Sequence, residues 1–372
     1  MNPEQLKFRI ALTLLNGVGN SIARNLIAYL GSEEAIFSEK KPLLMKIPGI
    51  GEATARQIVN HQDALRRAEA EIEFILKNKV SVHYYSDDSY PSRLRECNDA
   101  PLILYSRCAA GFNTRRVVSI VGTRNATEYG KRMCHNLVMG LSGIPSLLIV
   151  SGLAYGIDIC AHKASLEANL PTVGVVAHGL DRIYPGHHRA TAVQMLEKGG
   201  LVTEYLSNTN PDRQNFIQRN RIIAGMSDVI VIVESGLKGG ALITADLGGD
   251  YNRDVFAFPG RSGDEWSKGC NLLIKNNRAG LIESADDLLN SLGWMPSVSS
   301  VKKSIPGLFP ELTADESVVY AAIQSHGMPI QVNDLARTTK LPYNKVSAVL
   351  LNLEFKSVIR CMPGNCYVCI DI

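Results

Sequence analysis

A cation and an aromatic ring are spaced for joint action in the segment Arg213-Gln214-Asn215-Phe216. Positions three apart lie on one face of a helix, so a helix here would set the Arg213 guanidinium beside the Phe216 ring. Single-stranded nucleic acid is held in this way, by positive charge on its backbone and a ring under a base. The segment therefore indicates a single-strand site.

Two more arginines follow at once, in the run Arg219-Asn220-Arg221. On a helix, Arg219 and Arg221 point to different sides, so we expect different roles for them. One would serve a phosphate and the other a structural ion pair. The alternative, a solvated basic face, is weakened by Ile217, Ile222 and Ile223, which would bury the helix.

Glycine-containing turns follow other apolar runs of the chain. Glycine permits close backbone approach, an arginine fork or a hydroxyl can hold a phosphate, and the amides at a helix start favour anions. A surface ion pair is the alternative for any single arginine. The candidate phosphate ligands from these turns are Gly122, Thr123, Arg124, Ser151, Gly152, Gly156, Lys238 and Gly240.

Patterns that would indicate catalysis are weak or missing. Asp158 and His162 stand four apart and could bond each other, yet helix capping by Asp158 is favoured because no nucleophile accompanies them. The chain has no GxxxxGK[ST], G-x-S-x-G or H-E-x-x-H run. Cys361, Cys366 and Cys369 lack a fourth ligand. We therefore predict no catalytic residue, no metal and no cofactor, and we interpret His178, His187 and His188 as surface histidines.

The elements that position the candidate ligands follow from periodicity. Short β-branched runs (VVSIV, LLIV, TVGVV, DVIVIV, VFAF) alternate with segments of helical period between residues 116 and 282. This pattern is typical of βα units around a parallel sheet, and it predicts the α/β class with an extended Rossmann-like sheet. Strands predicted at 80–85 and 101–105 would extend that sheet. Ligands of such a sheet bind at its strand ends.

Three further regions are predicted around the domain at 80–295. Residues 1–79 resemble a helical helix-hairpin-helix module, since two hydrophobic-Gly-x-Gly turns each lead into a helix, the first capped by Ser21. Their amides could face a phosphate, or the turns could simply be tight. Residues 296–311 read as a linker. Residues 312–372 predict three helices and a hairpin, a winged helix whose apolar third helix favours a protein contact over strong duplex binding.

Composition limits the partners. The formal net charge of +3 means that contacts with nucleic acid must come from local clustering. The start, MNPEQLKFRIALTLL, lacks the apolar core of a signal peptide, and no run has the length of a membrane span. Eight scattered cysteines favour reduced thiols. We therefore expect a cytoplasmic protein without a membrane partner.

Taken in order, the motifs resemble those of the bacterial DNA-processing protein A (DprA, or Smf) family. The resemblance covers Tyr90 to about Leu292 and rests on GTR, SGLAYGID with AH, GLDRIYP, FIQRNRIIAG, LITA, and FPG followed by GCNLLI. It implies a single-stranded DNA-binding recombination mediator that forms homodimers and loads the RecA recombinase during natural transformation. The family's DNA pocket, carried onto this chain, falls on Gly122, Arg124, Arg213, Phe216 and the run Arg219-Asn220-Arg221.

The chain departs from the family pattern at three places. Gly239-Gly240-Ala241 stands where Ser-Gly-Ser is common, so amide contacts would survive there without the hydroxyls. His178 replaces a small residue, and His188 stands near a position that is often Asn.

Two rival functions remain open at this stage. A Rossmann hydrolase that releases the base from nucleoside monophosphates would need a carboxylate near the ribose, and Glu204 and Glu234 are the candidates. The run Pro-Gly-Gly-x-Gly-Thr that characterises such enzymes is missing. The other rival is a scaffold whose winged helix binds a protein while the sheet binds nothing.

Overall fold

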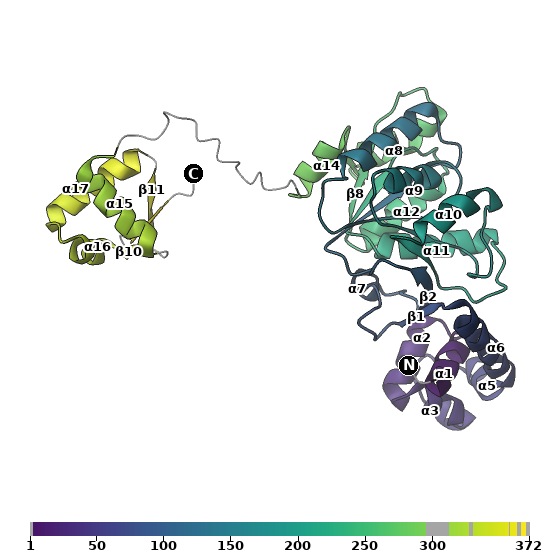
Figure 1. Cartoon of the computed structure of the whole chain (residues 1–372). Helices are drawn as coiled ribbons and strands as arrows, with labels where there is room; N and C mark the ends of the chain where they lie inside the picture. Colours follow the sequence, from purple (N-terminus) through teal and green to yellow (C-terminus); the bar gives the residue numbers. More distant parts are fainter. Residues whose placement is uncertain (1–2, 295–311, 327–329, 357, 363–365, 370–372) are drawn as a thin grey trace. The chain divides into compact units, whose positions relative to one another are not determined.

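The computed structural model describes residues 3–294, 312–326, 330–356, 358–362 and 366–369. The chain divides into two units, Met1–Pro296 and Ser297–Ile372. The helical module and the sheet domain lie together in the first unit, and the winged-helix unit is drawn in yellow-green in Figure 1. The linker predicted at 296–311 lies outside the described residues.

A large mixed sheet forms the centre of the first unit. In the described part of the chain it has nine strands in the order β1-β2-β6-β5-β4-β3-β7-β8-β9. Strands β3 to β9 pair in parallel, and β1 and β2 continue the sheet in antiparallel fashion beyond β6. The strands are β1 (Ser81–Tyr84), β2 (Ile103–Cys108), β3 (Arg116–Val121), β4 (Leu147–Ser151), β5 (Thr172–Val175), β6 (Gly200–Thr203), β7 (Val229–Ile232), β8 (Asp254–Ala257) and β9 (Gly280–Leu281).

Helices cover both faces of the sheet because its strands are apolar on both sides. Along β3, Val117 and Val121 belong to one core cluster, and Val118 and Ile120 belong to the other. This alternation is the period of two expected of a strand. One face is covered by α8 (Glu128–Gly140), α9 (Ile157–Glu167) and α14 (Ala285–Ser291), and the other by α7 (Ser92–Arg95), α11 (Arg213–Gly225), α12 (Gly240–Asp250) and α13 (Lys268–Lys275). The prediction of an α/β domain with an extended Rossmann-like parallel sheet is confirmed.

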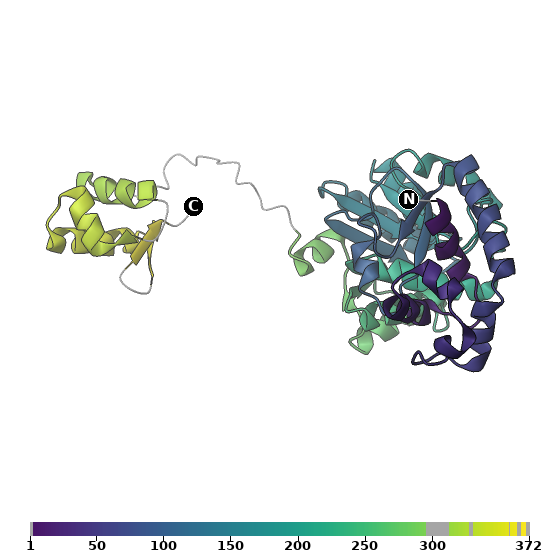
Figure 2. The same ribbon diagram turned by 90° about the horizontal axis from the view of Figure 1, so that it is seen from below.

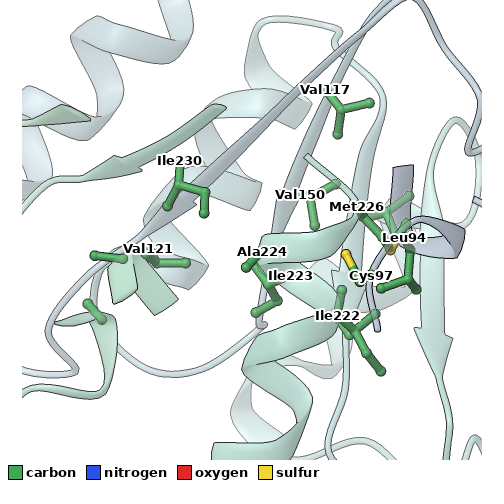
Figure 3. Packing of buried hydrophobic residues seen from close by; sticks show 14 of the residues in the cluster. Leu94, Cys97, Val117, Val121, Val150, Ile222, Ile223, Ala224, Met226 and Ile230 are labelled. Atoms are coloured by element: carbon green, nitrogen blue, oxygen red, sulfur yellow. The ribbon is translucent and has the colours of Figure 1, made fainter. Parts of the chain in front are cut away.

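Helix α11 is fixed to the sheet by its carboxyl-terminal half. Ile222, Ile223 and Met226 pack against Leu94 and Cys97, as Figure 3 shows. A Cβ atom added to Gly225 would lie 2.5 Å from Leu94 Cδ1, so the two segments are in close contact. The amino-terminal half of α11 carries Arg213 and Phe216 and is less buried. Three shorter helices complete the domain, namely α10 (Arg189–Met195), η1 (Gly186–His188) and η2 (Glu265–Ser267).

The amino-terminal module consists of helices, as predicted. Its two glycine turns lead into α2 and α5 with Gly19 and Gly51 as the capping residues. The prediction that Ser21 caps α2 is wrong, because Ser21 lies inside the helix and Gly19 precedes it without a side-chain cap. The helices are α1 (Pro3–Thr13), α2 (Asn20–Leu30), α3 (Glu33–Ser38), α4 (Lys41–Leu44), α5 (Glu52–Val59) and α6 (Gln62–Asn78).

Polar contacts fix the module to the sheet domain. Asn20, the first residue of α2, donates from Nδ2 to the carbonyl of Asp99 and accepts from the amide of Leu102. The buried carboxylate of Glu71 on α6 accepts hydrogen bonds from the amide and hydroxyl of Ser207, the latter at 2.5 Å. In Figure 2 the purple and dark-blue helices of the module lie in front of the sheet domain. The start of α2, directly after the first glycine turn, therefore serves a protein contact.

The second unit is a small winged helix. Helices α15 (Ala314–His326), α16 (Val332–Thr339) and α17 (Tyr343–Phe355) pack around Val319, Leu335 and Leu350. Strands β10 (Ile330–Gln331), β11 (Ile359–Met362) and β12 (Cys366–Cys369) form its sheet in the order β10-β12-β11. The predicted winged helix is confirmed, and residues 327–329 and 363–365 lie outside the described part of the chain.

Candidate functional site

The candidate ligands lie at a reversal in the order of the parallel strands. The chain passes outward from β3 through β4, β5 and β6, and then returns to place β7 on the other side of β3. In open α/β sheets, ligands bind outside the carboxyl ends of the strands at such a switch point. The turns that follow β3, β4 and β7 begin there.

Backbone contacts hold these three turns together. The amide of Thr123 donates to the carbonyl of Glu234 at 2.7 Å, and the amide of Ile157 donates to the carbonyl of Thr123 at 3.1 Å. Gly156 has φ +78°, and a Cβ atom there would lie 2.1 Å from the Thr123 carbonyl oxygen. Gly122 similarly leaves room for the Ile157 side chain. These glycines are needed for packing between the turns, whatever ligand the turns bind.

Arg124 and Phe216 meet at this edge of the sheet. The exposed guanidinium of Arg124 lies over the Phe216 ring, with Cζ 4.8 Å from the ring centroid. Such a cation over a ring contributes about 0.5–1 kcal/mol at an exposed site. Among the described residues, neither Arg124 nor the exposed Arg213 has a carboxylate partner. Both guanidiniums are therefore free for a phosphate.

Three residues form one stripe along α11. Arg213, Phe216 and Asn220 are spaced three and four apart, so they share a face of the helix. At the far end of the stripe, Asn220 Nδ2 donates to the carbonyl of Gly240 at 3.4 Å. Lys238 is exposed just before that glycine. The stripe thus runs from Arg124, which contacts Phe216, to the turn before α12, which contacts Asn220.

Arg219 lies in the interior, with only 3% of its surface exposed. Its Nη1 donates to the carbonyl of Gly152 at 2.6 Å and to the carbonyl of Val175. Burial lowers the pKa of Arg219 to about 10, and the nearby Asp158 opposes that change. The side chain stays charged at neutral pH and ties the ends of β4 and β5 together.

Two other predicted ligands also bind within the protein. Ser151 is fully buried and donates from Oγ to the carbonyl of Ile120 at 2.6 Å. Arg221 pairs with Glu204 and donates to the carbonyl of Asp99. The expectation that one of Arg219 and Arg221 serves a phosphate therefore needs correction, because the structure gives both arginines intramolecular partners.

Asp158 and His162 do not bond each other. Asp158 accepts from the amide of Ala154, and His162 Nδ1 lies 2.7 Å from Thr172 Oγ1. Burial lowers the pKa of His162 to about 3, with Arg219 adding to the effect. Burial raises the pKa of Asp158, and Arg219 opposes that shift. The pair serves the interior of the domain.

The carboxylates named for a hydrolase are engaged elsewhere. Glu234 accepts from the amide of Thr127 at 2.9 Å and from its hydroxyl at 2.5 Å, at the start of α8. Glu204 pairs with Arg221, and burial raises its pKa. Both carboxylates therefore have partners inside the protein, and Glu234 also borders the cleft beside α8 described below.

Two aromatic residues escaped the sequence analysis although they stand inside the quoted motifs SGLAYGID and GLDRIYP. Tyr155 and Tyr184 are each 44% exposed at the same sheet edge. The interpretation of His178 and His188 as surface histidines is wrong, because both are buried. In the folded chain each exposed tyrosine lies next to a buried histidine. The spacing of the residues in the sequence does not show this arrangement.

A cleft of about 970 Å³ opens on the other side of the switch point, beside α8. Carboxylates outnumber cations in its lining. It is lined by Thr127, Glu128, Tyr129, Arg132, Glu234, Pro259, Gly260, Arg261, Asp264, Glu265, Trp266 and Glu283. This acidic side contrasts with the Arg124 side.

The described residues were also searched for a metal site and for a membrane-spanning helix. Within the described residues, no group of three or more His, Cys, Asp or Glu side chains is arranged to hold a metal ion. No described helix combines the length and apolarity needed to span a bilayer.

Comparison with known proteins decides the family. The sequence profile described as DNA recombination-mediator protein A matches residues 81–293. The chain belongs to this family. The DprA winged helix domain matches residues 307–365, and a SAM-like helix-hairpin-helix tandem matches residues 8–61.

Relatives of the DprA family match between 56% and 98% of the chain. Protein Smf of Synechocystis is 31% identical over 98% of this chain and 99% of its own length. The putative DNA processing protein DprA of Mycobacterium tuberculosis is 31% identical over 83% of each chain. The DNA processing protein DprA of Bacillus subtilis is 37% identical over 56% of this chain and 69% of its own.

Solved structures of the family share the fold. DprA from Streptococcus pneumoniae superimposes with a TM-score of 0.63 at 29% identity, covering 78% of this chain and 97% of that one. DprA from Helicobacter pylori, whose structure concerns its binding mode for single-stranded DNA, gives a TM-score of 0.51 at 29% identity. It covers 57% of this chain and 95% of that one.

Buried His162 predicts an acid-sensitive sheet domain. Its pKa is about 3 in the folded protein and near 6.5 when unfolded, so only the unfolded chain gains this proton as the pH falls below about 6.5. The resulting loss of stability is about 1.4 kcal/mol per pH unit. Between about pH 7 and pH 5, the free energy of unfolding of His162→Gln should therefore fall by roughly 2 kcal/mol less than that of wild type. Urea unfolding followed by tryptophan fluorescence measures both.

Asp158 titrates in both proteins, so its contribution cancels in this comparison. Equal acid sensitivity of wild type and His162→Gln would contradict a neutral, buried His162.

Proposed function

We propose that this chain binds single-stranded DNA along α11 and the carboxyl ends of β3, β4 and β5. The observation that carries the proposal is the Arg124 guanidinium lying 4.8 Å over Phe216 at the switch point, without a carboxylate partner among the described residues. The pair combines the two groups that hold a single strand, a cation for the phosphates and a ring for the bases.

Phosphates are bound along one line in this proposal. Arg124 and Arg213 bind phosphates near Phe216, where the strand lies closest to the sheet. The flanking phosphates bind to Asn220, Lys238 and the amides around Gly240. These groups lie close together, because Asn220 contacts the Gly240 carbonyl. Thr123 can donate its hydroxyl proton, because within the described part of the chain its Oγ1 accepts from the amide of Asn125 and donates to no other group. Ser151, Arg219 and Arg221 hold the turns in place.

The comparisons support this choice of ligand. The family is described as a recombination mediator, and the related H. pylori protein binds single-stranded DNA. The local charge also fits, because Glu204, Glu234 and Glu71 are each occupied by internal partners. The protein is then a binding protein that acts without catalysis.

We propose further that the bound strand is passed to RecA recombinase in the cytoplasm during natural transformation. The support is membership of the family, and the winged helix is available as a protein contact.

A transfer role predicts faster assembly of RecA on protected DNA. On single strands coated with single-strand-binding protein, electron microscopy should show more RecA filaments when wild type is added and no increase with Arg124→Ala. No increase with wild type would contradict the transfer role and leave DNA binding untouched.

The proposal includes a homodimer. Exposed Leu237, Ile243 and Leu272 line a cleft of about 380 Å³ between the turn before α12 and helices α12 and α13. Exposed apolar side chains gathered around a hollow are typical of an interaction surface. We assign a second copy of this chain to that surface, because an isologous contact would bring two DNA sites into one particle and raise avidity.

Leu272→Glu should convert the dimer into a monomer, because a buried carboxylate without a partner destabilises the contact. Sedimentation velocity measures the change. Leu76→Glu, at an exposed leucine on α6, is the control and should remain dimeric. A wild type that sediments as a monomer at micromolar concentration would contradict the dimer.

The two halves of the Arg124 and Phe216 pair are expected to differ in their salt dependence. Arg124→Ala removes a phosphate contact, so the slope of log affinity against log salt should fall by about 0.7. Phe216→Ala should weaken oligothymidine binding with little change in slope, because stacking carries no counterion term. Fluorescence anisotropy across a salt series measures both.

Arg66→Ala, at an exposed arginine on α6, is the matched control and should bind as wild type does. Since Arg124 and Phe216 touch, the double variant should lose less affinity than the sum of the single losses. Wild-type binding that ignores salt would contradict the proposed site.

A further inference from the structure

One exposed tyrosine ring stands next to Phe216, and a second is carried by the turn that packs against Arg124. Tyr184, in the loop after β5, has its ring centroid 6.0 Å from that of Phe216. Tyr155, in the turn after β4, lies edge-to-face with the His188 ring, centroid to centroid 4.9 Å. His188 also donates from Nδ1 to the Leu153 carbonyl at 2.9 Å, so the loop that carries Tyr184 is fixed to the turn that carries Tyr155.

Phe216 itself offers limited stacking area. Its side chain is partly buried, Arg124 lies over the ring at 4.8 Å, and the buried Arg219 lies 5.7 Å from the ring centroid. Tyr155 and Tyr184, each 44% exposed, leave more ring surface accessible. The larger area for bases therefore belongs to the tyrosines.

We propose that Tyr184 and Tyr155 are base-stacking sites that take successive nucleobases of the strand next to those at Arg124 and Phe216. The inference rests on the proposed function and extends its site from one aromatic ring to three. It assigns the ligand as unstacked bases of the same single strand, on rings contributed by the turns after β4 and β5.

The ring geometry indicates separate bases for separate rings. A base held between two rings needs them parallel and roughly 7 Å apart, which is twice the ~3.4 Å spacing of stacked bases. The Tyr184 and Phe216 rings are 6.0 Å apart and inclined at 57°. They cannot enclose a shared base in this geometry, so each ring presents its own surface.

Buried histidines hold both tyrosines before DNA binds. His178 donates from Nδ1 to the Gly179 carbonyl, and its Nε2 accepts from the amide of Tyr184 at 3.2 Å. His188 packs against the Tyr155 ring as described above. A ring that is already in place loses less conformational entropy on binding.

The surroundings suit a nucleic acid strand as well. Arg189 is exposed directly after the buried His188, so a positive charge lies on this side of the rings. Arg182, near Tyr184 in sequence, is paired with Asp181 and contributes less. A phosphate that follows the stacked bases therefore meets a cation on this side.

If the tyrosines stack on bases, removing their rings should lower the affinity only for DNA that carries bases. With the full-length chain, Tyr155→Ala and Tyr184→Ala should each weaken oligothymidine binding by roughly 5-fold to 20-fold. Tyr155→Phe and Tyr184→Phe should bind within about twofold of wild type, because the ring remains. On a fully abasic oligomer of equal length, the alanine variants should match wild type. Fluorescence anisotropy at fixed salt gives all three comparisons.

Tyr29→Ala, at an exposed tyrosine on α2, is the control and should leave both affinities unchanged. Alanine variants that bind oligothymidine as wild type does, while Arg124→Ala is weakened, would overturn the stacking inference and leave the proposed function standing. Equal losses on the abasic oligomer would also overturn it, by showing a structural role. If wild type does not bind oligothymidine, the inference and the proposed function fail together.

Discussion

The site depends on the charge of Arg219 inside the protein. Its guanidinium binds the carbonyls of Gly152 and Val175, which end two neighbouring strands, and it faces the buried Asp158. A buried charge is costly unless hydrogen bonds and an opposite charge compensate it, and here both are present. Gly152 has no room for a side chain, since a Cβ atom there would lie 2.3 Å from Arg219 Nη1. The turns after β4 and β5 are thus fixed relative to α11.

This internal tie explains how a mildly basic protein can present a local cationic edge. Arg219 binds the carbonyls of Gly152 and Val175, and Arg221 pairs with Glu204, whereas Arg124 and Arg213 stay exposed at the sheet edge. In the lining of the cleft beside α8, carboxylates outnumber cations. Like charges repel, so a phosphate backbone is directed away from that cleft and onto the α11 side.

Much of the fold follows from periodicity in the sequence. The alternation seen in Val117, Val118, Ile120 and Val121 required burial on both faces, and the parallel sheet with helices on either side satisfies it. The winged helix was readable from its three helical segments and hairpin. The pairing of β2 with β6 was not, because an antiparallel contact across about a hundred residues leaves no local pattern.

The site was predicted in part, for a physical reason. The spacing of Arg213 and Phe216 fixed their common face on a helix, whereas the roles of Arg219 and Arg221 depended on which carbonyls and carboxylates the sheet brings near them. The same holds for His178 and His188, whose burial is set by loops that meet only in the folded chain. Tyr155 and Tyr184 were missed because their exposure is a property of the surface.

The central claim is that the strand lies across the turns after β3, β4 and β5 and along the first half of α11. Ultraviolet cross-linking of oligothymidine to the full-length protein, with the attached peptides identified by mass spectrometry, tests it most directly. The account predicts cross-links in the segments around Arg124, Tyr155, Tyr184 and Phe216. Cross-links confined to the helical module at 3–78 or to the winged helix at 343–355 would contradict it.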